Sequence, residues 1–172
     1  MSPVIKSKPR QAGIELIRTS TLPYVPTPYE SATLNLKLFD MRREPELRRA
    51  RSWFITEFHP ASADEYFATL TSDKNAWMRM VIGYWDMAAS MVTHGAIDRD
   101  MFLAAHTEII GAFAKAHPYL AEVRARIGPL VLAHVESVVM SIPNAEDEMA
   151  KRRARLKGLW EARKAAQQTE NT

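Results

Sequence analysis

The sequence predicts an all-α protein built as a single helical bundle, and three observations support this fold class. Apolar residues recur at helical spacing through most of the 172 residues. Helix start and stop signals such as Pro45, Ser62 and Gly95 divide the chain into helices of ordinary length. No stretch shows a convincing strand alternation. With 47% apolar and 25% charged residues, the composition is that of one globular domain.

Residues 1–30 differ from the rest of the chain because prolines interrupt any continuous helix there. We expect an extended N-terminal arm that packs along its own domain or on a neighbouring subunit. The segment 23–29 also has polyproline character and a PxxP spacing that fits an aromatic groove. The candidate oligomer contacts in this arm are Pro23, Tyr24, Pro26, Pro28 and Tyr29.

Residues 31–142 are expected to form the bundle core. Leu34, Leu38 and Met41 share one face of the first helix, which Pro45 ends or kinks. The helix near residues 73–94 is apolar almost all round, so it belongs in the middle of the bundle. The expected helices are 31–58 with a break at residue 45, then 62–70, 73–94, 99–116, 118–127 and 130–142.

Residues 143–172 form a C-terminal helix and a frayed tail, with acidic residues in the first turn and basic residues after them. The segment contains seven basic and five acidic residues, and an apolar edge makes the helix amphipathic. Three roles remain open for this helix. It docks on the bundle, it associates with a partner through Leu156 and Trp160, or it contacts an anionic surface or nucleic acid. The candidate anion contacts are Lys151, Arg152, Arg153, Arg155 and Lys157.

One acidic residue stands out in the central apolar helix. Asp86 lies between Trp85 and Met87, and a carboxylate buried there needs a cationic partner. The sequence therefore predicts a buried ion pair with an arginine, and it predicts that Asp86→Asn lowers stability by about 2–4 kcal/mol. The candidate partners are Arg48, Arg51 and Arg124.

The sequence excludes several classes of site. There is no cysteine, so no disulfide or cysteine-ligated zinc can form. The five histidines lack the spacing of helical metal ligands, and the six glycines are isolated, so no phosphate-binding loop can be written. We expect no catalytic residue, metal or cofactor. Neither a secretory signal nor a membrane-spanning segment is evident, so a cytoplasmic location is expected.

Three segments together resemble a bacterial helical family known only as a domain of unknown function. They are PELRRARSW at 45–53, YWDMAASMVTHGAID at 84–98, and HPYL at 117–120 followed by Arg124 and Gly128. The likeness spans about residues 40–142, with one departure at Val135, where an aromatic residue is more usual. The resemblance implies an all-helical bundle and brings no activity, substrate or cofactor.

These observations favour a non-enzymatic interaction protein that forms homo-oligomers through its arm or its terminal helix. The first alternative is a weak binder of nucleic acid or anionic surfaces through the basic helix. The second is an apolar-ligand protein with a pocket in the central helix. That pocket would be lined by Trp77, Tyr84, Trp85, Met87 and Met91.

Overall fold

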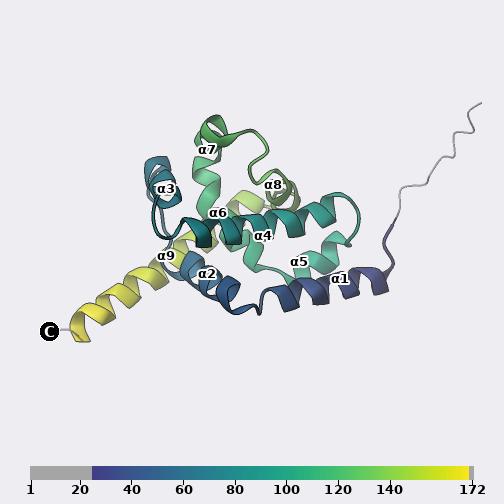
Figure 1. Ribbon diagram of the computed structural model, residues 1–172, viewed down its shortest axis with the longest axis horizontal. Helices are drawn as coiled ribbons and strands as arrows, with labels where there is room; N and C mark the ends of the chain where they lie inside the picture. The colour runs from purple at the N-terminus through teal and green to yellow at the C-terminus, as the bar shows by residue number, and fades with distance from the viewer. Residues whose placement is uncertain (1–24, 171–172) are drawn as a thin grey trace, which may run out of the picture.

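The computed structural model describes residues 25–170, and every regular element in that range is a helix (Figure 1). The predicted all-α bundle is confirmed. The helices are α1 (Pro28–Met41), α2 (Pro45–Thr56), α3 (Ala63–Leu70), α4 (Asn75–Thr93), α5 (Arg99–Ala105), α6 (Glu108–Ala116), the 3-10 turn η1 (His117–Tyr119), α7 (Leu120–Ile127), α8 (Ala133–Met140) and α9 (Ala145–Glu170).

The first helix begins earlier than expected. Thr27 caps α1 through its side chain, and Pro28 occupies the first turn, where its missing N–H costs nothing. Pro28 and Tyr29 are therefore helical, although the sequence placed them in the extended arm. Pro26 precedes the helix, and the predicted contacts Pro23 and Tyr24 lie outside the described residues.

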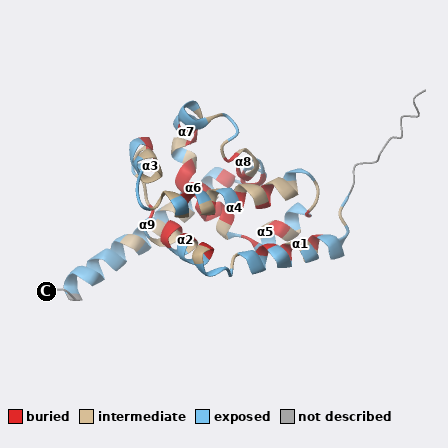
Figure 2. Ribbon diagram, in the orientation of Figure 1, coloured by how far each residue is buried: buried red, intermediate tan, exposed pale blue. Residues whose placement is uncertain are grey.

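Helix α4 lies at the centre of the bundle, as its all-round apolar pattern predicts. It packs against α2 on one side and α8 on the other, while α6 packs on α8 and α9. Buried residues gather where these helices meet (Figure 2). The largest fully buried side chains are Trp85, Tyr66, Phe54, Phe102 and Phe113, and burial of such side chains stabilises the fold most.

Two expected helices are shorter than the sequence suggested. The helix predicted over 99–116 breaks at His106, whose backbone leaves the helical region at φ −126° and ψ 45°. The helix predicted over 130–142 starts only at Ala133. Gly128 and Leu132 have φ values of 147° and 55°, so the backbone is left-handed at both positions and cannot continue a helix between them.

Helix α9 has two halves with different surroundings. In the first half, Met149 is buried and Leu156 packs over Gly111 of α6. Beyond Trp160 the helix runs past the other helices and is exposed (Figures 1 and 2). The predicted apolar edge therefore docks the first half on the bundle.

Candidate functional site on the outer face of helix α1

Helix α1 turns a mixed polar and apolar face toward the bundle, and Leu34 is partly buried against the core there. Ser31, Asn35 and Leu38 are its buried residues. The Ser31 hydroxyl accepts a hydrogen bond from the backbone N–H of Asp98 at 3.0 Å, which ties α1 to the start of α5. The Asn35 amide oxygen lies 3.0 Å from Nε2 of His106. Hydrogen bonds therefore contribute strongly to holding α1 in place.

One flank of α1, next to its buried face, carries exposed apolar side chains. Tyr29 is 81% exposed, Leu36 66% and Phe39 52%. Together with Ala32 they recur at a 3-4-3 spacing, which places all four on one stripe of the helix. We call these four residues the outer stripe. Met41, which the sequence placed on the buried face with Leu38, is also exposed.

A charged network fixes the C-terminal end of α1. Arg42 Nη2 donates to Oε2 of Glu108 at 2.9 Å, and Arg51 Nε of α2 donates to Oε1 of the same carboxylate at 2.8 Å. All three side chains are at least three-quarters buried. The Arg42 guanidinium also lies over the Trp85 ring, 5.2 Å from its centroid. One carboxylate therefore joins α1, α2 and α6.

The tautomer of His106 follows from its two neighbours. Arg42 is always protonated, so its Nη1 donates to Nδ1 of His106, 3.3 Å away. The ring proton is then on Nε2 and is donated to Asn35. Burial, reinforced by the nearby Arg42 charge, lowers the pKa of His106 to about 4. The neutral ring is a structural core histidine.

The predicted ion pair of Asp86 does not form among the described residues. Its carboxylate instead accepts the backbone N–H of Val135 at 3.2 Å, near the start of α8. Arg51 binds Glu108, and Arg124 binds Glu136 at 2.7 Å. Arg48 donates to the carbonyl of Arg43. The prediction that arginines form ion pairs in the bundle was therefore right, but their partners are Glu108 and Glu136 and not Asp86. The choice of partner depends on how the helices pack.

The predicted contacts on α9 are divided among different neighbours. Leu156 faces Gly111, and Trp160 stacks on His59 with ring centroids 5.2 Å apart. Both apolar side chains are thus partly covered within the chain. Lys151 pairs with Glu148, while the remaining basic residues do not line up along one surface; these are Arg152, Arg153, Arg155 and Lys157.

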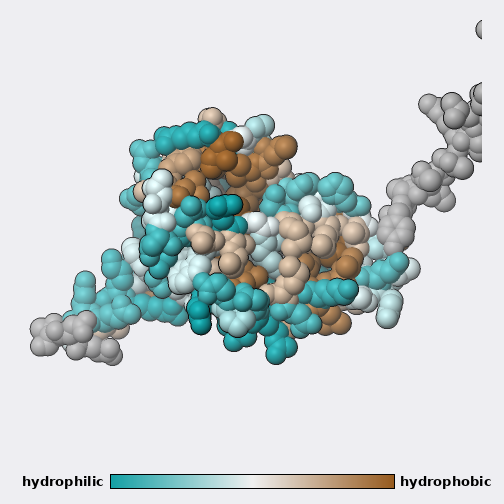
Figure 3. Space-filling model, in the orientation of Figure 1, coloured by the Kyte–Doolittle hydropathy of each residue, from teal (hydrophilic) through white to brown (hydrophobic). Residues whose placement is uncertain are grey.

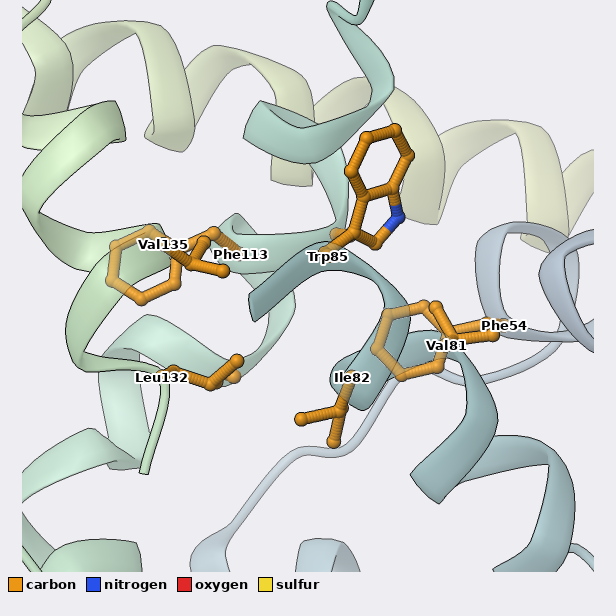
Figure 4. A pocket seen from close by; sticks show the side chains of 9 residues that line it. Phe54, Val81, Ile82, Trp85, Phe113, Leu132 and Val135 are labelled. Atoms are coloured by element: carbon orange, nitrogen blue, oxygen red, sulfur yellow. The ribbon is translucent and has the colours of Figure 1, made fainter. Parts of the chain in front are cut away.

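Among the described residues, the void that the central helix lines beside Trp85 is too small for a ligand. The void beside Trp85 measures about 10 Å³, which is room for no more than one water molecule. Apolar side chains such as Val81, Phe113 and Leu132 close around it (Figure 4). The hydroxyl of Tyr84 donates a hydrogen bond to the carbonyl of Leu38. The residues proposed for an apolar pocket therefore serve mainly as packed core.

Two further kinds of site can be assessed in the described range. No group of three or more histidine, aspartate or glutamate side chains there is arranged to hold a metal ion. None of the helices from α1 to α9 combines the length and apolar character needed to cross a bilayer.

A second apolar patch lies on the turn between α7 and α8. Ile127 and Leu130 are 52% and 79% exposed there, and Figure 3 shows the brown surface over this part of the molecule. This patch sits on an irregular segment without the repeat that helix packing uses. The outer stripe of α1 has that repeat, so it is the stronger candidate for a protein contact.

The sequence model of DUF4760, a domain of unknown function, matches residues 29–141. The chain belongs to the DUF4760 family. The matched range contains the whole outer stripe and the Arg42–Glu108–Arg51 network, whereas α9 follows it. No curated protein and no solved structure matches the chain.

Proposed function

We propose that this DUF4760 domain is a non-enzymatic assembly module that pairs with a second copy of itself through the outer stripe of α1. One observation carries the proposal: α1 already buries Ser31, Asn35 and Leu38 in the bundle, yet it presents the further apolar side chains of Tyr29, Leu36 and Phe39 to solvent. A helix that served only the bundle would place its apolar face inward. We keep the cytoplasm as the expected compartment.

An antiparallel pair of α1 helices gives the stripe a complementary partner. A two-fold axis near residue 34 places Tyr29 against Phe39 of the second copy, and Leu36 against its Ala32. Large side chains then meet aromatic or small ones, as tight helix packing requires. The opposed helix dipoles favour this orientation over the parallel one. A two-fold contact uses the same patch on both copies, which is the commonest form of homodimer.

The proposed dimer is weak because the stripe is short. One helix pair buries less than the total of about 1,200–2,000 Å² found in stable interfaces, so we expect a Kd of tens of micromolar. Apolar residues supply most of the contact, so high salt should leave the association largely unchanged.

Sedimentation velocity of the full chain from about 1 to about 500 µM tests the proposal. The unmodified chain should shift from monomer to dimer, and Leu36→Lys should stay monomeric. Leu159→Lys on α9 is the matched control, because Leu159 is 53% exposed and lies outside the stripe. A monomer at every concentration, or equal effects of both substitutions, would contradict the proposal.

A further inference from the structure

A cleft lies where α9 passes the end of α6 and the loop between α2 and α3. Its volume is about 440 Å³, and its polar wall contains His59, Lys115, Tyr119, Arg153 and Lys157. Alanine and proline residues form the remainder of the wall. The cleft is far larger than the void in the core and is distinct from the outer stripe.

The wall of this cleft carries positive charge without a carboxylate. Lys115 is only 2% exposed, and its Nζ lies within 2.8 Å of the carbonyl oxygens of Phe54, Ile55 and Phe58. Arg153 Nη1 donates to the carbonyl of Ala114. Carbonyls satisfy these donors but carry no net charge. In the described range neither Lys115 nor Arg153 forms an ion pair, so their charge remains uncompensated.

The third cation stands at the mouth of the cleft. The side chain of Lys157 is 60% exposed, and its nearest carboxylate is that of Glu161, 3.9 Å away. The two form an exposed i,i+4 ion pair, which contributes little, so the ammonium can exchange Glu161 for a ligand. Arg153 has five guanidinium N–H groups and uses only one of them on Ala114 among the described residues. Both side chains can donate to an anion. Burial lowers the pKa of Lys115 to about 7, so this lysine adds only a partial positive charge behind them at neutral pH.

His59 shapes the cleft without adding charge. Its ring stacks on Trp160, and its Nε2 lies 3.3 Å from Nζ of Lys115. Burial and the neighbouring Lys115 charge lower the pKa of His59 to about 4. At neutral pH the ring is uncharged, so the positive potential comes mainly from Arg153 and Lys157, with a partial contribution from Lys115.

We propose that this cleft binds one small phosphate-bearing molecule, with Arg153 and Lys157 donating to the phosphate oxygens. Phosphate suits the site because its oxygens accept several charge-assisted hydrogen bonds at once. A long nucleic acid fits less well, since it needs a continuous basic track. Arg152 and Arg155 instead line a separate cleft of about 180 Å³ beside Glu108. The inference is independent of self-association.

Calorimetric titration of the full chain with inorganic phosphate, pyrophosphate and glycerol 3-phosphate tests this site. Potassium chloride keeps the ionic strength constant throughout, which separates binding from general screening. We expect saturable binding of one ligand per chain with a Kd near or below about 1 mM. If glycerol 3-phosphate binds more tightly than phosphate, the natural ligand is a phosphate ester. If phosphate binds more tightly, the natural ligand is the free ion. Both results support the proposal.

Two substitutions on α9 make the test specific. Lys157→Ala should weaken binding about tenfold, because it removes a charged donor from the ligand. Lys151→Ala is the control and should leave binding unchanged, since Lys151 is 72% exposed, pairs with Glu148 and lies outside the cleft. Arg153→Gln should also weaken binding, and circular dichroism confirms that each variant remains helical.

Three results would overturn the proposal. The first is no saturable binding of any of the three probes. The second is an equal loss of binding in Lys157→Ala and Lys151→Ala, which would indicate diffuse attraction to α9. The third is tight binding of a single-stranded oligonucleotide that both substitutions weaken alike, since a nucleic-acid surface would then explain the basic helix.

Discussion

The first and last helices of the described chain are attached to the bundle in opposite ways. Helix α1 buries Ser31 and Asn35 and leaves Leu36 and Phe39 in solvent. Helix α9 buries Met149 and places most of its charged residues outside. The two helices thus expose surfaces of opposite character, one apolar and one basic, for which we propose separate partners.

This difference determines how each attachment responds to change. A buried polar network depends on every partner, because one lost group leaves others desolvated and unpaired. An attachment through apolar packing loses stabilising free energy in proportion to the contact removed, so it tolerates small changes in side-chain shape. We therefore expect the attachment of α1 to be sensitive to single substitutions and that of α9 to be more tolerant.

The largest expected effect is on the carboxylate that α1 shares with α2. Glu108→Gln leaves Arg42 and Arg51 without a counter-charge in a largely buried position. The free energy of unfolding, measured in urea, should fall by about 3–5 kcal/mol. Asp64→Asn is the control, because the Asp64–Arg126 pair is exposed and should contribute under about 1 kcal/mol. Similar losses in both variants would show that the network does not anchor α1.

Acid should weaken the same attachment. His106 has a pKa of about 4 in the folded chain and an ordinary value near 6.5 when unfolded. Between these values the unfolded chain binds a proton that the folded chain does not, so stability is lost as pH falls from 6.5 toward 4. The contribution of His106 is up to about 3 kcal/mol, and His59 acts in the same direction.

Urea unfolding at several pH values in this window measures the slope, and His106→Gln provides the comparison. The glutamine amide can still accept from Arg42 and donate to Asn35 but cannot take up a proton. The variant should lose part of the slope and retain the part due to His59. Identical slopes in both proteins would exclude His106 as the source.

The smallest expected effect concerns the packing of α9 on α6. A methyl group added at Gly111 would lie 3.5 Å from Cδ1 of Leu156, which is ordinary contact. Gly111 is inside α6, where alanine is the better helix former, so Gly111→Ala should raise the free energy of unfolding by about 0.5–1 kcal/mol. Chemical denaturation measures this gain. A loss of stability would mean that α9 is seated more tightly than we describe.

The sequence was a good guide to local structure. Ser62 caps α3 as predicted, because a cap depends on residues next to it in the chain. The sequence did not predict the helix break at His106. The His106 ring there contacts Asn35 and Arg42, which are far away in the chain. Helix periodicity alone cannot show such a partner.

The candidate sites depended on tertiary contacts and were harder to predict. Leu34, Leu36 and Leu38 look alike in sequence, yet Leu38 is buried, Leu34 is partly buried and Leu36 is exposed. Hydrogen bonds to Ser31 and Asn35 help to set this rotation of α1. Lys115 was also missed. A lone lysine in the apolar run of α6 was the available signal, since burial of a lysine requires dedicated acceptors.

Cysteine cross-linking most directly tests the central claim that the outer stripe pairs with a second copy. The chain has no cysteine, so single introduced thiols report one contact each. In the antiparallel pair, chains carrying Ala32→Cys should form disulfide-linked dimers when mixed with chains carrying Leu36→Cys. Chains carrying Leu159→Cys should remain monomeric. Absence of the 32–36 cross-link, or equal cross-linking through position 159, would contradict the account.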